Sequence, residues 1–83
     1  MNLEEILIKI QNMLFEKYTI NMDFDAVLME NGFDSVSIIE LIINIEDLFD
    51  IEFDSSQLNY RLLKSIRTIS EYIDSILRGT NDK

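Results

Sequence analysis

The sequence feature that most constrains the fold is an apolar stretch, residues 35–49, whose apolar side chains recur at spacings of three and four. An α-helix turns by about 100° per residue, so such spacing places these side chains on one face. Isoleucine favours strands, but the stretch is too long for an ordinary strand and lacks strict alternation. We therefore predict an amphipathic helix over 35–49. Its core-facing residues are Ile38, Leu41, Ile42, Ile45, Leu48 and Phe49.

A short polar turn marks the start of this helix. Asp34 suits the N-cap position, because its carboxylate can accept hydrogen bonds from the free N–H groups of the first turn. Ser35 is then the first helical residue, and we expect its hydroxyl to face solvent. Gly32 permits a bend just upstream. Ser37 and Glu40 form a second possible capping box, which would move the start further along the chain.

Three aliphatic side chains of the same helix, those of Val36, Ile39 and Ile43, lie about 130° from the centre of the core-facing stripe. A surface helix should be polar there, and the acidic residues Glu40 and Asp47 flank the three. Apolar side chains with a charged rim predict a partner-docking site made of these five residues. Alternatively, another part of the chain covers them.

The rest of the chain predicts a small helical bundle. Proline is absent and only two glycines occur, so the chain lacks the turn residues of a many-stranded fold. A capping box at Asn2 and Glu5 begins a first helix, and Ser65 caps the last helix, whose inward side chains include Ile76 and Leu77. We predict an all-α fold, with three principal helices and a short extra one. The expected single domain, 1–83, comprises a helix at 3–17, a long loop at 19–33 with a helical turn at 25–29, the helix at 35–49, a short helix at 55–63 and a helix at 66–78.

Composition excludes several classes of function. Cysteine and histidine are absent, which removes disulfides, thiolate metal sites, the cysteine nucleophile and the commonest general base. A hydrolytic role for Ser35 lacks both an activating base and a G-x-S-x-G motif. We therefore expect no enzymatic activity and assign no catalytic residue.

Alternating carboxylates raise the possibility of a calcium loop. In an EF-hand loop starting at Asp50, the positions for glycine and for the last carboxylate hold Ser55 and Arg61. In a loop starting at Asp23, the third ligand position holds Val27. We therefore predict no metal site.

Negative charge is concentrated in the middle of the chain. Between Tyr18 and Tyr60 there are ten acidic residues and no basic ones, whereas the remainder has seven basic and six acidic residues. The two parts carry −10 and +1, which gives the net charge of −9. A field of one sign around Ser35 would attract basic partners and repel nucleic acid, although it could also serve solubility alone.

The first residues contain neither a basic segment nor an apolar run long enough for a signal peptide or a membrane span. We therefore expect a cytoplasmic protein without membrane insertion.

The motif G-x-D-S-V of Gly32 to Val36, followed by a helix that ends in E-D-L-F-D-I-E-F, resembles the carrier proteins: acyl, peptidyl and D-alanyl carriers. The resemblance extends from the first helix to the closing S-I-R-T-I-S-E-Y-I-D-S-I-L. In that family, the serine of a D-S-L-like motif receives a 4′-phosphopantetheine arm from coenzyme A, and the arm's thiol holds the cargo as a thioester. The resemblance implies attachment at Ser35, with Asp34 as the flanking residue of the motif.

The resemblance also implies partners. These are a phosphopantetheinyl transferase, a loading enzyme (a ligase, an adenylating enzyme or an acyltransferase) and a downstream synthase or transferase, which a monomeric carrier would meet in turn. Carriers of fatty acid synthesis usually have an acidic residue where this chain has Ser37, and the region of Tyr60, Arg61 and Lys64 is more basic than in that type. These departures favour a specialised pathway, such as polyketide, nonribosomal peptide or aminoacyl transfer, over fatty acid synthesis. An unmodified helical interaction module that uses the same apolar residues is the alternative from another class.

Overall fold

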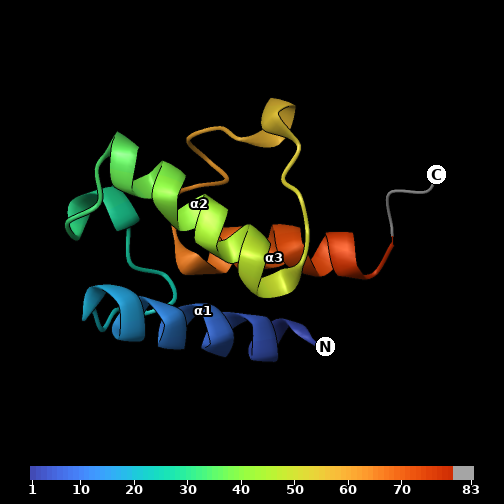
Figure 1. The fold of residues 1–83 in the computed structure, drawn as a ribbon, viewed down its shortest axis with the longest axis horizontal. Helices are drawn as coiled ribbons and strands as arrows, with labels where there is room; N and C mark the ends of the chain where they lie inside the picture. Colours follow the sequence, from blue (N-terminus) through green and yellow to red (C-terminus); the bar gives the residue numbers. More distant parts are fainter. Residues whose placement is uncertain (80–83) are drawn as a thin grey trace.

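The structure is a computed structural model that describes residues 1–79. In Figure 1, α1 lies below α2, and α3 lies between and behind them. The chain contains α1 (Leu3–Tyr18), the 3-10 helix η1 (Leu28–Glu30), α2 (Ser35–Phe49), the 3-10 helix η2 (Ser55–Gln57) and α3 (Ile66–Leu77). These three α-helices, with no strand among the described residues, confirm the predicted all-α bundle.

Side-chain caps fix where the outer helices begin. The Asn2 side chain accepts a hydrogen bond from the Glu5 N–H, and the Glu5 carboxylate accepts one from the Asn2 N–H, both at 2.9 Å. At the start of α3, the Ser65 hydroxyl oxygen accepts a hydrogen bond from the Thr68 N–H at 3.2 Å. Both predicted caps are therefore present, and each satisfies N–H groups that the first helical turn leaves free.

The core is formed by the apolar stripes of the three helices together with side chains from the loops. Burial of one large aliphatic side chain contributes about 1.5–3 kcal/mol, so these stripes supply most of the driving force for folding. Met22, Leu28, Phe33 and Phe53 add to the core from outside the α-helices, which holds the loops against the bundle. The fully buried aliphatic side chains are Ile6, Ile10, Leu14, Leu28, Leu41, Ile45, Ile66, Ile69 and Ile73.

Two predicted inward positions are wrong, because Leu48 and Leu77 are exposed. Leu48 lies about 80° from the centre of the α2 stripe, at its edge. Leu77 is the last residue of α3, where the helix ends. An apolar residue of a helix is buried only where a neighbouring element covers it, and neither the edge of the α2 stripe nor the end of α3 is covered.

The short helix expected at 55–63 is largely replaced by turns. The 3-10 helix η2 covers only its first three residues, Ser55–Gln57. The Asp54 carboxylate accepts from the Ser56 N–H at 3.0 Å, and the Asn59 side-chain oxygen accepts from the Leu62 N–H at 2.9 Å. Such local side-chain bonds compete with helical hydrogen bonding, which explains the turns. The helical turn expected at 25–29 is also displaced: the structure has the 3-10 helix η1 at Leu28–Glu30 instead.

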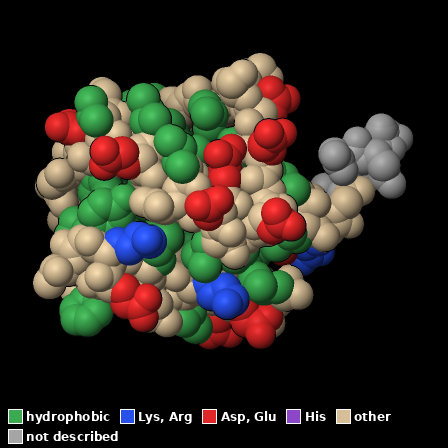
Figure 2. Space-filling view, viewed as in Figure 1, with side chains coloured by type: hydrophobic (Ala, Val, Ile, Leu, Met, Phe, Trp, Pro, Cys, Tyr) green, Lys and Arg blue, Asp and Glu red, His purple; other side chains and the backbone are tan. Residues whose placement is uncertain are grey.

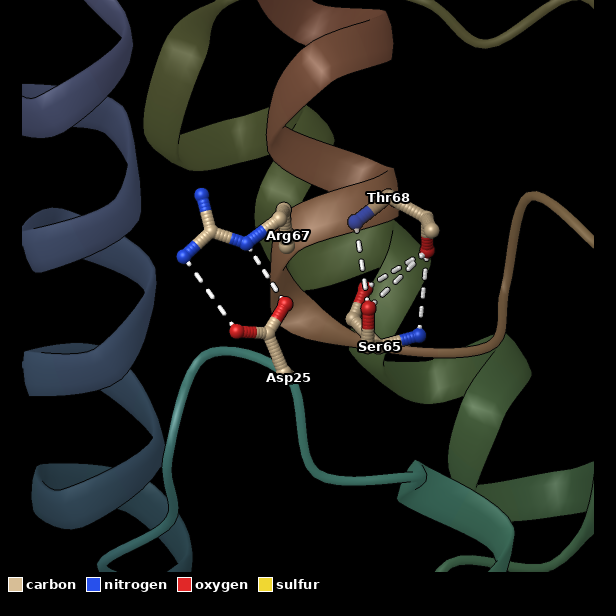
Figure 3. A network of polar contacts seen from close by, with 4 residues as sticks. All are labelled: Asp25, Ser65, Arg67 and Thr68. Carbon is tan, nitrogen blue, oxygen red and sulfur yellow. Dashed lines mark hydrogen bonds and ion pairs between the residues drawn. The ribbon is translucent and has the colours of Figure 1, made fainter.

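The long connection between α1 and α2 is fastened to the start of α3. The Arg67 N–H donates to the Phe24 carbonyl at 2.9 Å, and the Leu28 N–H donates to the Lys64 carbonyl at 2.8 Å. Figure 3 shows the guanidinium of Arg67 meeting the carboxylate of Asp25 beside the α3 cap. This contact holds the pKa of Arg67 above its ordinary value. The connection that leads into α2 is therefore held in place although most of it is not helical.

Ser70 provides a test of packing in α3. Its side chain is fully buried, and its hydroxyl has no hydrogen-bond partner among residues 1–79. A buried hydroxyl without a partner costs about 1–3 kcal/mol, so Ser70→Ala is expected to raise the free energy of unfolding by about 1 kcal/mol. Ser65→Ala removes a helix cap and should lower the free energy of unfolding by about 1 kcal/mol. Urea unfolding of the two variants measures both changes, and a loss of stability in Ser70→Ala would contradict the assignment.

Candidate functional site

Ser35 is the first residue of α2 and lies at the surface. The Asp34 carboxylate caps the helix, since it accepts from the Ser37 N–H at 2.9 Å. The Ser37 hydroxyl donates to the same oxygen at 2.9 Å, so the alternative helix start at Ser37 does not form. The Ser35 hydroxyl has no hydrogen bond to any residue between 1 and 79, and the residue is exposed to solvent.

The cap also determines the charge beside Ser35. The backbone N–H and the hydroxyl of Ser37 donate to Asp34 and hold the pKa of its carboxyl below the ordinary value. Asp34 is therefore ionised at neutral pH. It adds negative charge to the neighbourhood of the serine while it fixes the first helical turn.

The turn before Asp34 is fixed by the conformation of Gly32 and by contacts of the buried Phe33. Gly32 adopts a φ of +100°, a conformation that other residues rarely take. Phe33 is buried and meets the ring of Tyr18 edge to face, with the ring centroids 5.7 Å apart. The Phe33 N–H donates to the Leu28 carbonyl at 3.2 Å. The residue before the cap is thus anchored in the core, while Asp34 and Ser35 stay exposed.

The three aliphatic side chains of the predicted docking site are open to solvent. Val36, Ile39 and Ile43 are 66%, 61% and 55% exposed, and Glu40 and Asp47 are exposed as well. No other part of residues 1–79 covers them, so the alternative in which the chain buries them does not hold there. Figure 2 shows hydrophobic side chains gathered over the part of the molecule where α2 lies, with acidic side chains among them. We call Val36, Ile39 and Ile43 the α2 patch.

An open groove of about 290 Å³ lies directly beside Ser35. Its walls come from three parts of the chain: the loop around η1, the first turns of α2, and the segment between η2 and α3. Sequence reasoning missed this groove, because its walls are brought together only by the fold. The one local feature that could have indicated the groove is the presence of large apolar or aromatic side chains in otherwise polar loops. The groove residues include Met29, Ser35, Ile39, Leu58, Tyr60 and Leu63.

The acidic stretch is almost free of ion pairs. The described residues form two, Asp25 with Arg67 and Asp74 with Arg78. Only Asp25 belongs to the ten acidic residues between Tyr18 and Tyr60. The other nine carboxylates therefore repel one another through solvent, and a basic partner surface would relieve that repulsion.

This repulsion predicts that salt stabilises the fold. Charges are screened beyond about 30 Å in 0.01 M salt but beyond about 10 Å in 0.1 M salt, so the repulsion weakens over that range. We expect the melting temperature to rise from the lower to the higher concentration. Sodium chloride and choline chloride should act alike, which would separate screening from binding of a metal cation. A melting temperature that does not change with salt would contradict the prediction.

The described part of the chain has no group of three or more acidic residues placed to hold a metal ion. None of the helices between residues 1 and 79 has the length and apolar character needed to cross a membrane.

Comparison with known proteins identifies the family. The model of the family described as "Phosphopantetheine attachment site" matches residues 9–73. The aminoacyl carrier protein of Agrobacterium fabrum (strain C58) is 36% identical over 55 residues, which span 66% of this chain and 66% of that relative.

A chain in the crystal structure of Bradyrhizobium japonicum glycine:[carrier protein] ligase complexed with glycylated carrier protein has a similar fold. Its TM-score is 0.62 at 20% identity, over 83% of this chain and 95% of that one. This likeness concerns the fold and agrees with the predicted carrier-type bundle. Because the family model covers more than half of the sequence, the chain belongs to the phosphopantetheine-attachment family of acyl and peptidyl carrier proteins.

Proposed function

We propose that this protein is a carrier whose 4′-phosphopantetheine arm is attached to Ser35. The observation that carries the proposal is the exposed Ser35 hydroxyl at the capped start of α2, inside the region that the family model matches. When attached, the arm supplies a thiol that holds an acyl or aminoacyl group as a thioester. The chain's own contribution is to present the serine on a fixed helix start.

In this proposal the chain acts as an acceptor and performs no catalysis itself. The sequence has no histidine, and no lysine or arginine occurs between Tyr18 and Tyr60 to activate the serine. The phosphopantetheinyl transferase therefore supplies the base. The Ser35 oxygen bonds to the phosphorus that carries the pantetheine of coenzyme A, and the pyrophosphate bond breaks. Adenosine 3′,5′-bisphosphate leaves, and the serine proton passes to the transferase.

We propose an amino acid as the cargo. The aminoacyl carrier protein relative supports this choice over a carrier of fatty acid synthesis. The partners would then be an aminoacyl-loading ligase and a downstream transferase. The cytoplasmic location expected from the sequence stays a prediction.

These partners would dock on the α2 patch with Glu40 and Asp47 at its rim. The patch is small, and its surroundings are acidic, which suits fast, charge-assisted association and rapid release. A carrier needs both, since it must leave one enzyme before it meets the next. An unmodified interaction module using the same patch would instead bind one partner with slow dissociation.

The direct test is intact mass after incubation with coenzyme A and a broad-specificity phosphopantetheinyl transferase. We expect the mass to rise by one phosphopantetheine group. A known carrier protein treated in parallel verifies that the transferase is active, and circular dichroism verifies that the substrate is folded. An unchanged mass under these conditions would overturn attachment and favour the interaction module.

A further inference from the structure

A second open groove, which we call the α1–α2 groove, is lined by these two helices and shares no lining residue with the groove beside Ser35. Its volume of about 410 Å³ falls within the range of about 300–1,000 Å³ that binding pockets span. In Figure 2, basic side chains lie towards α1, below the hydrophobic and acidic side chains over α2. The residues of the groove include Lys9, Met13 and Lys17 from α1, and Asn44, Asp47 and Leu48 from α2.

The two lysines of the α1–α2 groove have no acidic partner. Lys9 and Lys17 are exposed, and neither forms an ion pair within residues 1–79. They are eight residues apart on α1, which corresponds to about 12 Å along the helix axis. The neighbouring surface of α2 carries the exposed carboxylates of Glu40 and Asp47. Two positive charges are therefore left free at the edge of a negatively charged surface.

Apolar side chains complete the lining of the α1–α2 groove. Met13 is buried, but Leu48 is 42% exposed although it belongs to the apolar stripe of α2. Apolar contacts surrounded by polar and charged side chains are the usual composition of a protein–protein interface. The exposure of Leu48 thus leaves apolar area that a partner can cover.

We propose that the α1–α2 groove docks an acidic segment of the enzyme that acts on Ser35, an inference that rests on the proposed function. The segment carries carboxylates that meet Lys9 and Lys17, and an apolar side chain that covers Leu48. The α2 patch with its acidic rim favours apolar and basic groups instead. The docking surface of the partner therefore presents both signs of charge, basic groups opposite α2 and acidic groups opposite α1.

The groove and the α2 patch form one continuous surface, because Asp47 lies at the rim of the patch and also lines the groove. Asp47 is twelve residues beyond Ser35, which corresponds to about 18 Å along the helix. An interface of ordinary size covers about 800 Å² of each partner, which is a patch about 30 Å across. One enzyme that reaches Ser35 can therefore cover the groove as well.

The lysines contribute specificity, because they make the docking surface asymmetric in charge. A partner that carried only basic groups would be attracted to α2 but repelled by Lys9 and Lys17. The same repulsion opposes an enzyme that docks in the reverse orientation, since its basic groups would then lie on α1. Like-charge contacts of this kind suppress wrong partners and fix the register of the right one.

The test measures initial rates of loading by the transferase with the double variant Lys9→Glu, Lys17→Glu. We expect kcat/KM to fall about tenfold through a higher KM, because the variant loses binding contacts and retains kcat. The milder pair Lys9→Gln, Lys17→Gln should show a smaller fall in the same direction. It guards against a folding defect, since Lys17 lies in the last turn of α1, where the helix dipole disfavours an added carboxylate. Circular dichroism verifies the fold of each variant.

The matched control is the double variant Arg61→Glu, Lys64→Glu. It changes the net charge by the same amount, and both residues are exposed and absent from the lining of the α1–α2 groove. If charge acted only at long range, the added negative charge would attract a basic enzyme more strongly, and both double variants would load faster. We expect only the α1 variant to load more slowly.

Three results would overturn this docking surface: unchanged or faster loading of the α1 variant, equal slowing of both double variants, or a fall in kcat alone. Sedimentation of the wild type and the α1 variant tests the identity of the partner. A wild-type dimer that the α1 variant lacks would assign the groove to a second copy of the chain. Failure of the wild type to load would instead overturn attachment at Ser35, and the docking surface with it.

Discussion

Ser35→Ala is expected to abolish loading by phosphopantetheine completely. The hydroxyl oxygen is the atom that would form the phosphodiester, and alanine has no atom to replace it. The fold should be unaffected, because Ser35 is exposed and its hydroxyl makes no hydrogen bond within residues 1–79, while Asp34 still caps the helix through the Ser37 N–H. Intact mass after treatment with coenzyme A and transferase measures the loss, and the melting temperature should match that of the wild type.

Ser37→Ala is the matched control. It deletes a hydroxyl two residues away that donates to Asp34, but it keeps the backbone N–H that donates to the capping Asp34 carboxylate. We expect this variant to gain the full mass of one arm. Two outcomes would contradict attachment at Ser35. One is loading of Ser35→Ala, and the other is loss of loading in Ser37→Ala with the fold retained.

The helix starts could be predicted from the sequence because capping is a local interaction. Asn2, Asp34 and Ser65 each lie within three residues of the N–H group that they accept from, so the residue types alone indicate the helix start. The position of Ser35 follows from one such cap. For the same reason, the exposure of its hydroxyl could be anticipated before the fold was known.

The groove could not be predicted, because it depends on contacts between distant parts of the chain. Met29 and Tyr60 are far apart in sequence, and they reach the groove because the Leu28 N–H is bonded to the Lys64 carbonyl and the Phe24 carbonyl to the Arg67 N–H. No periodicity encodes those bonds. The short helix expected at 55–63 failed for a related reason, since its polar side chains bond to nearby backbone groups and stabilise turns instead.

Ile43→Asp is expected to lower the kcat/KM of loading by the transferase by about tenfold to a hundredfold, or about 1.4–2.7 kcal/mol. Ile43 is 55% exposed in the α2 patch and does not line the groove beside Ser35. The variant therefore tests docking without altering the surroundings of the serine. A carboxylate within an apolar contact must lose its hydration when the partner binds, and this cost weakens the complex. Initial rates of mass gain at several carrier concentrations give kcat/KM.

Ile8→Asp separates this contact from a general effect of charge. Ile8 is 42% exposed on α1, so the substitution places the same negative charge on an exposed helical position outside the α2 patch. Both variants carry one additional negative charge and an aspartate within a helix, so they share any change in long-range attraction and helix propensity. If docking uses the α2 patch, only Ile43→Asp slows loading. Equal rates for the two variants would mean that the transferase approaches Ser35 without covering Ile43, and that the exposed aliphatic face of α2 serves a different partner.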